Sequence, residues 1–315
     1  LHAQIADDTT IEWCTVSATI NENIGMVVNQ IYHHQPDIIA ATNWLFNHEQ
    51  LLHIVSRAKA LLPHCCIVLG GPEFLGNNEA FLRKNKFVNG VFRGEGEEVF
   101  PIWLKVWNHP VNEWNQISGL CYLDESDQYQ DNGIARVMNF SQLVSPEKSR
   151  FFNWSKPFVQ LETTRGCFNT CAFCVSGGEK PVRTISLEAI RERLNVIHQH
   201  GIKNVRVLDR TFNYNNKRAK DLLNLFREYP DSKVITVDDD LIYPRNTVER
   251  LLSLSYQYPD TVCGNVIRKI HMDGNSFSVY RKWTKVFTMP VNSSLQNVAI
   301  GCGGIYYPLV WRGVV

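Results

Sequence analysis

The sequence lacks several features that would assign it to a special class of protein. It has no run of about 18 uninterrupted apolar residues, so we expect no membrane-spanning helix. Its 32 Lys and Arg residues nearly balance 31 Asp and Glu residues, and this net charge of +1 gives no electrostatic reason to expect a nucleic-acid partner. There is no signal peptide and no initiator methionine before Leu1, which is consistent with missing upstream sequence.

The rest of the composition is that of an ordinary globular protein. Hydrophobic residues make up 44% of the chain and charged residues 20%, which excludes disorder, collagen-like repeats and coiled coil. A length of 315 residues is enough for two or three domains, each with its own core.

Nine cysteines are more than packing usually requires. Their odd number and wide scatter do not match a secreted disulfide framework, which favours a cytoplasmic protein. Six of them lie in apolar or isolated contexts where a thiol packs as a small hydrophobe. These six are Cys14, Cys65, Cys66, Cys121, Cys263 and Cys302.

The other three, Cys167, Cys171 and Cys174, fall within the eight residues CFNTCAFC. Thiolates clustered on a short loop bind zinc or an iron–sulfur cluster. A structural zinc site normally needs four protein ligands, and no second Cys/His pair at finger spacing follows; we interpret His198 and His200 as ordinary surface residues. Three thiolates leave one iron of a 4Fe-4S cluster open, so the motif predicts a chemical site and not a structural one.

With the preceding strand FVQLETTRG and the aromatic Phe173, this spacing resembles the radical SAM superfamily. The resemblance implies that the open iron chelates S-adenosylmethionine (SAM). An electron from the cluster then cleaves SAM to a 5′-deoxyadenosyl radical, which abstracts hydrogen from a small-molecule substrate. It also implies an electron donor such as flavodoxin or ferredoxin.

The next segment predicts a helix over 186–201, a strand over 204–212 and a helix over 215–229, in the βαβα order of a parallel barrel. Function in such barrels lies at the carboxyl ends of strands. The resemblance therefore implies that Asp209 and Arg210, with Phe173, contact SAM; the alternative for Asp209 is a capping or turn role. We interpret Gly177–Glu179 as a loop, because the SAM-holding Gly-Gly-Glu of the superfamily belongs after the second strand.

Residues 1–110 alternate between strands and helices and predict a doubly wound parallel sheet. The strings VLGGPE and FRGEGEEVF resemble the cobalamin-binding domain that precedes the barrel in one radical SAM class. An Asp-x-His-x-x-Gly string is absent, so a Rossmann-like domain without cobalamin is an equal alternative. The residues that would line the cobalamin face are Gly70, Gly71, Glu73, Gly94, Glu95 and Gly96.

The segment 231–315 has a different character. The apolar strand KVITV runs into three aspartates at 238–240, and GCGGIYYP follows later. Together they resemble GT-A type glycosyltransferases, which implies that Asp238 and Asp240 hold Mg²⁺ or Mn²⁺ against a nucleotide-sugar diphosphate. The alternative for the triplet is a capped helix or a turn.

The predicted fold class is therefore α/β: a doubly wound Rossmann-like, cobalamin-binding-like domain (1–110), a hairpin and linker (111–150), a partial (β/α) radical SAM barrel (151–230) and a short α/β glycosyltransferase-like segment (231–315). A six-unit barrel needs roughly 190 residues, far more than the third part contains. The leading hypothesis is a radical SAM enzyme of unknown substrate. The alternatives are a metal-dependent glycosyltransferase and an inactive fusion of two truncated enzymes.

Overall fold

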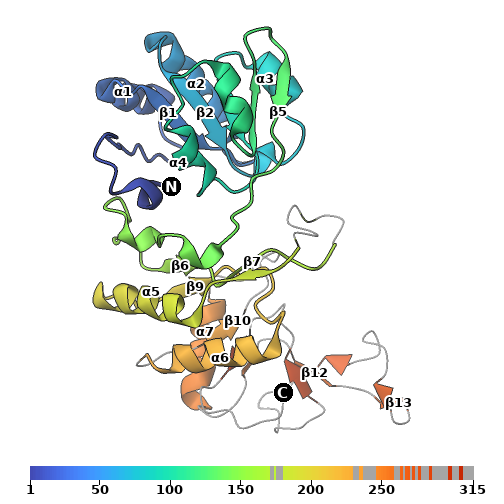
Figure 1. Ribbon diagram of the computed structural model, residues 1–315. Coiled ribbons are helices and arrows are strands. Elements are labelled where there is room, and N and C mark those ends of the chain that lie inside the picture. Colours follow the sequence, from blue (N-terminus) through green and yellow to red (C-terminus); the bar gives the residue numbers. More distant parts are fainter. Residues whose placement is uncertain are drawn as a thin grey trace. The chain divides into compact units, whose positions relative to one another are not determined.

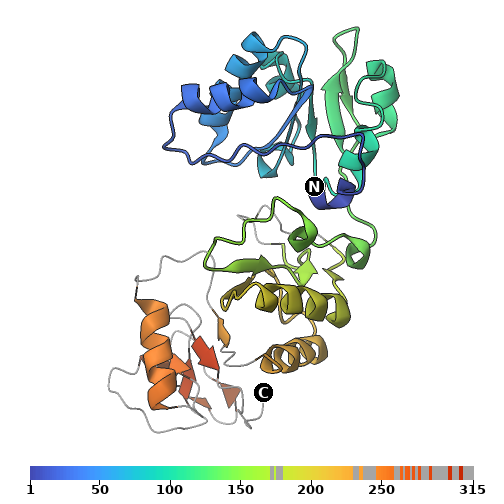
Figure 2. The ribbon, with the colours of Figure 1, turned by 90° about the vertical axis from the view of Figure 1, so that its left-hand side faces the viewer.

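A computed structural model describes residues 1–170, 174, 180–229, 246–258 and 263–264. It also describes the backbone of the strands at 234–236, 267–269, 272–273, 276–277, 284–285, 297–299 and 305–307. The chain divides into two compact units, Leu1–Asn215 and Asn216–Val315. Figures 1 and 2 show the ribbon from two sides, coloured along the sequence. None of the described helices is long and apolar enough to cross a membrane.

The first unit begins with a five-stranded sheet in the order β1-β2-β3-β4-β5. Its strands are β1 (Ile38–Thr42), β2 (Cys66–Gly70), β3 (Gly90–Phe92), β4 (Leu120–Leu123) and β5 (Tyr129–Asp131). The first three are parallel, and the hairpin β4–β5 adds to β3 in antiparallel orientation. The three strands within 1–110 are thus parallel, as the sequence predicted, and the hairpin expected within 111–150 extends them into a mixed sheet.

Helices cover both faces of this sheet (Figure 2). They are α1 (Ile24–His34), α2 (His48–Leu61), α3 (Glu79–Lys84) and α4 (Val99–Trp103), with short 3₁₀-helices at His2–Ile5, Pro72–Phe74 and Val111–Gln116. On one face Ile67 and Leu69 pack with residues of α2 and α3. On the other face Val68 packs with Phe100 and Trp103 of α4. Strand β2 is apolar throughout because both of its faces are buried.

Both parallel crossovers run through helices on the same face, so the strand order does not reverse among the described strands. The predicted doubly wound sheet is therefore correct in having two covered faces. It differs in having no reversal of strand order between its parallel strands. The second face is covered not by a crossover helix but by α4 and the segment that leads into the hairpin.

The second half of the first unit is a short βαβ arrangement. It comprises β6 (Val159–Leu161), β7 (Thr164–Arg165), β8 (Arg183–Thr184), α5 (Leu187–Gln199) and β9 (Val205–Val207), preceded by 3₁₀-helices at Phe140–Gln142 and Pro146–Lys148. β6 and β9 are parallel neighbours. The helix expected over 186–201 is confirmed: the Ser186 side chain caps it by accepting from the Ala189 amide, and Ile190 and Ile197 are buried.

The second unit contains α6 (Asn216–Arg227) and α7 (Thr247–Gln257). Its strands are β10 (Val234–Thr236), β11 (Cys263–Gly264), β12 (Ile267–Lys269), β13 (Met272–Asp273), β14 (Ser276–Phe277), β15 (Thr284–Lys285), β16 (Asn297–Ala299) and β17 (Ile305–Tyr307). β17 lies between β10 and β11, antiparallel to both. The division between units falls before α6, whereas the sequence placed a boundary after residue 230. The predicted domain limits remain predictions.

Candidate functional site

The cysteine motif lies on the connection between β7 and β8, which we call the cysteine loop (residues 166–182). Its base is closed by antiparallel pairing of Thr164 with Thr184 and of Arg165 with Arg183. Cys167 is buried, Cys174 is partly exposed, and both are free thiols. Cys171, Phe173 and Gly177–Glu179 lie outside the described residues.

The entry into this loop is a backbone turn at Gly166, whose φ is 98°. Side chains with a Cβ rarely adopt such a left-handed conformation, so glycine is the residue suited to this position. The Thr211 hydroxyl, beyond β9, donates to the Gly166 carbonyl at 3.4 Å. The turn that leads to Cys167 is therefore held from the neighbouring strand end.

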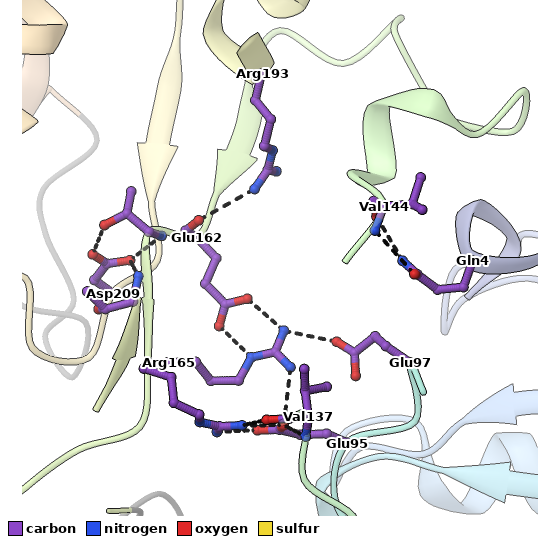
Figure 3. A network of polar contacts seen from close by, with 12 residues as sticks. Gln4, Glu95, Glu97, Val137, Val144, Glu162, Arg165, Arg193 and Asp209 are labelled. Atoms are coloured by element: carbon purple, nitrogen blue, oxygen red, sulfur yellow. Dashed lines mark hydrogen bonds and ion pairs between the residues drawn. The ribbon is translucent and has the colours of Figure 1, made fainter. Parts of the chain in front are cut away.

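Asp209 makes a second connection between the same two strand ends. One of its oxygens accepts from the backbone amides of Thr163 (2.7 Å) and Thr164 (2.9 Å), and the other accepts from the Thr163 hydroxyl (Figure 3). Thr163 and Thr164 are buried, so the bonds to Asp209 satisfy donors that water does not reach. The carboxylate predicted to contact SAM is directed at the backbone that precedes the cysteines. Contacts of Asp209 and of the exposed Arg210 with SAM remain predictions.

Two acidic residues after β3 contact the base of the cysteine loop. Glu95 forms a bidentate ion pair with Arg183, at 2.6 and 2.7 Å, and lies 3.7 Å from Arg165 (Figure 3). Glu97 pairs with Arg165 at 2.9 Å. Sequence reasoning placed Glu95 on a cobalamin face and missed these partners.

The ion pairs determine the protonation of Glu95. Burial on its own would raise the pKa of Glu95, but hydrogen bonds from Arg183 and the Val137 amide, with the charges of Arg165 and Arg183, outweigh it. The pKa of this carboxyl therefore lies below its ordinary value, and Glu95 is ionised at neutral pH.

Arg165 is also held by Glu162, through bonds of 3.0 and 2.8 Å, and it stacks on the Phe140 ring at 4.5 Å. Burial would lower the pKa of Arg165, but Glu162 and Glu97 raise it above the ordinary arginine value. Arg165 therefore stays positively charged, and the carboxylates of Glu162 and Glu97 balance its charge.

A buried ion pair adjoins these contacts at Glu162. Arg193 of α5 binds Glu147 with bonds of 3.0 and 2.8 Å, and it also reaches the Glu162 carbonyl at 3.4 Å. This pair fastens α5 to the segment that precedes β6. Neither residue belongs to a recognisable motif, so sequence reasoning missed both.

The residues predicted to line a cobalamin face follow the carboxyl ends of β2 and β3. Two of the glycines have packing reasons of their own. A Cβ on Gly71 would lie 2.4 Å from the Asn43 carbonyl oxygen, and one on Gly94 would lie 2.3 Å from the Ala135 carbonyl oxygen. A Cβ added to Gly70 or Gly96 would lie no closer than 3.5 Å to another atom, so packing does not require glycine there. Glu73 is exposed. The structure thus explains Gly71 and Gly94 without a ligand.

The loop after β1 adds a feature that the sequence reasoning did not single out. Trp44, Leu45 and Phe46 are all exposed, Leu45 at 82%. They follow β1 as the glycine loops follow β2 and β3, so all three loops belong to the carboxyl ends of parallel strands, where such sheets bind ligands.

The described residues contain no group of three His, Cys, Asp or Glu side chains placed to hold a metal ion. Cys171, the middle cysteine of the motif, and Asp238–Asp240 are outside the described part of the chain. The structure therefore leaves the predicted cluster site and the alternative Mg²⁺ or Mn²⁺ site as predictions.

No protein-family model matches the chain. An uncharacterized methyltransferase from Pyrococcus horikoshii is 28% identical over 202 aligned positions, which cover 59% of this chain and 42% of that protein. The chain therefore spans less than half the length of this relative.

Solved structures share the fold. The cobalamin-dependent S-adenosylmethionine radical enzyme OxsB, solved with aqua-cobalamin and SAM bound, superposes with a TM-score of 0.53 and 20% identity over 68% of this chain and 32% of its own. The radical SAM methyltransferase TsrM from Kitasatospora setae, solved with cobalamin and a [4Fe-4S] cluster, gives a TM-score of 0.50 and 15% identity, covering 67% of this chain and 46% of its own. At these identities the likeness establishes an α/β fold shared with such enzymes.

Proposed function

We propose that the chain is part of a cobalamin-dependent radical SAM enzyme, of the methyltransferase class, in which Cys167, Cys171 and Cys174 bind a 4Fe-4S cluster. The observation that carries the proposal is the position of the cysteine motif. It begins directly after β7, at the carboxyl end of β6, within a βαβ arrangement. In parallel α/β structures this edge is where cofactors bind.

The donor set suits the cluster. Thiolates are the ligands that iron–sulfur clusters bind, and three of them leave one iron open for SAM. Cys167 and Cys174 are free thiols, and the residues before Cys167 are fixed by Asp209 and Thr211. A bound cluster would supply an electron to SAM. The protein's part is to hold the loop entrance in one conformation, which Gly166 and the Asp209 bonds do.

The N-terminal sheet suits a large, partly apolar ligand. Trp44, Leu45 and Phe46 form an exposed apolar loop after β1. Contiguous exposed apolar surface is typical of binding sites. The cobalamin named for OxsB and TsrM is a ligand of that size, and the Pyrococcus relative supports methyl transfer as the reaction class.

Anaerobic reconstitution of the full chain with iron and sulfide tests the cluster. We expect about four irons per chain and a broad visible absorption. Both disappear in the variant that combines Cys167→Ala, Cys171→Ala and Cys174→Ala. Both persist in Cys14→Ala, which removes a thiol that the sequence predicted to be packed but that is exposed in the structure. Iron binding that survives the triple variant would refute the proposal.

Cobalamin is tested separately by incubating the chain with hydroxocobalamin and measuring what coelutes on gel filtration. We expect coelution, and we expect it to weaken when Leu45→Ser makes the apolar loop polar. Glu79→Gln, an exposed change on α3, is the control. If cobalamin does not coelute with the unaltered chain, the Rossmann-like domain without a ligand is the correct interpretation.

One observation favours the glycosyltransferase alternative for the second unit. β10 precedes the aspartates 238–240, and β17 lies within GCGGIYYP, so the two strings that carry the resemblance provide paired strands. Mn²⁺-dependent hydrolysis of a nucleotide sugar, lost in Asp240→Asn, would support this function. Absence of any nucleotide-diphosphate affinity would remove it.

A further inference from the structure

The two ends of the cysteine loop meet at one carboxylate. Arg165 and Arg183 are opposite each other in the β7–β8 pair, one at each end of the loop. Both guanidinium groups approach Glu95, at 3.7 Å for Arg165 and 2.6 Å for Arg183. A single residue of the N-terminal part thus contacts both sides of the loop base (Figure 3).

Glu95 is itself held in place. The Val137 amide donates to it at 2.6 Å, and the Val137 carbonyl accepts from Arg183 at 2.8 Å. Gly94 precedes it with a φ of 100°, packed against Ala135 so closely that a Cβ would clash. The Glu95 side chain is 14% exposed, so its ion pairs are only weakly screened by water.

We infer that Glu95 is a positioning residue that clamps the base of the cysteine loop to the loop after β3. In this way it determines where Cys167, at the start of the cysteine loop, lies relative to the carboxyl ends of β1–β3. The inference rests on the proposed function only for what the loop binds. The two arginines differ in how they meet Glu95: Arg183 forms a bidentate pair with it, whereas Arg165 pairs more closely with Glu162 and Glu97.

The first test uses the iron-free chain and measures the alkylation rate of each thiol by mass spectrometry. Cys167 and Cys121 are both buried, so Cys121 in the N-terminal core reports unfolding of the whole unit. We expect Glu95→Gln to raise the Cys167 rate about tenfold, the effect of a 1.4 kcal/mol change in local opening. The Cys121 rate should stay unchanged.

Glu98→Gln is the matched control, since Glu98 lies three residues further along the same loop and contacts the Met138 amide at 3.3 Å, away from the cysteine loop. It should leave the Cys167 rate unchanged. Equal rises at Cys167 and Cys121 in Glu95→Gln would show that Glu95 supports the fold as a whole, and would overturn the inference. So would no rise at Cys167.

A double-mutant cycle identifies the partner. Because Arg183 carries the bidentate pair and Arg165 lies further away, Glu95→Gln should raise the Cys167 rate by a smaller factor in the Arg183→Gln background than in the unaltered chain. Additive increases would overturn the clamp.

Reconstituted protein separates this inference from the proposed function. We expect Glu95→Gln to keep its iron and to change the SAM-induced shift of the reduced cluster's electron paramagnetic resonance signal. An unchanged shift, with the iron retained, would overturn the clamp. If the unaltered chain binds no iron, the proposed function fails while the alkylation result still stands.

Discussion

Asp209 provides the sharpest test of how the entrance to the cysteine loop is held. Replacing it with alanine removes both oxygens that accept from Thr163 and Thr164. Replacing it with asparagine keeps one carbonyl oxygen, which can still accept from the two backbone amides, and a side-chain amide that can donate to the Thr163 hydroxyl. The two variants therefore differ in how many buried donors lose their partner.

The magnitudes follow from the burial of those donors. Thr163 and Thr164 are 0% and 1% exposed, so water cannot replace Asp209 without local opening. A buried donor without a partner costs about 1–3 kcal/mol, so the three bonds lost in Asp209→Ala should destabilise this region by about 3 kcal/mol or more. Asp209→Asn loses the charge on the acceptor and the oxygen that accepts from the Thr163 hydroxyl, and should cost about 1–2 kcal/mol.

Amide hydrogen exchange of the peptide that contains Thr163 and Thr164 measures this loss directly. Because each 1.4 kcal/mol changes the opening equilibrium tenfold, exchange should accelerate by roughly 100-fold or more in Asp209→Ala. In Asp209→Asn it should accelerate about tenfold. Asp221→Ala, which removes an exposed ion pair with Lys217, is the matched control and should leave the peptide unchanged.

The reasoning would be refuted if Asp209→Ala exchanged as slowly as the unaltered chain, or if alanine and asparagine were equally disruptive. The first result would mean that the three bonds do not form in solution. The second would mean that the negative charge, and not the satisfied donors, holds the strand end.

Three further predictions concern the surrounding contacts. Glu147→Gln breaks the buried pair with Arg193 and should lower the free energy of unfolding of the first unit by about 3–5 kcal/mol in denaturant titrations; a loss below about 1 kcal/mol would contradict this. Gly94→Ala should cost about 1–3 kcal/mol more than Gly133→Ala, because both have a positive φ but only Gly94 faces a close carbonyl, and equal costs would argue against that packing. The Glu95 carboxylate contributes stability above its ordinary pKa of 4.5, and this contribution is lost as the pH falls through the lower pKa of the folded chain. The difference in denaturation midpoint between the unaltered chain and Glu95→Gln should thus be constant from pH 6 to 8 and shrink as the pH falls below about 4.5; a difference that stays undiminished from pH 6 to pH 3 would be inconsistent with an ion pair.

Local patterns were sufficient for much of the fold. The apolar spacing at Ile190 and Ile197, with Ser186 before it, predicts α5 because helix periodicity and capping involve residues within a few positions of one another. The same holds for the cysteine motif, whose eight residues supply all three thiols. The hairpin β4–β5 was also predictable, but its addition to β3 was not, because strand pairing depends on an edge formed elsewhere in the chain.

The site required the tertiary structure. Glu95 and Arg183 are 88 residues apart, and Asp209 and Thr163 are 46 apart. A charged residue in a loop has many possible partners in the sequence, and only the folded chain selects one by bringing it within bonding distance. The sequence alone determined which thiols are candidate iron ligands and which segments form helices and strands, because both are properties of neighbouring residues. The tertiary structure decided that the base of the cysteine loop is held by an acidic loop of the N-terminal sheet and by a carboxylate beyond β9, because burial and ion pairing depend on distances in space.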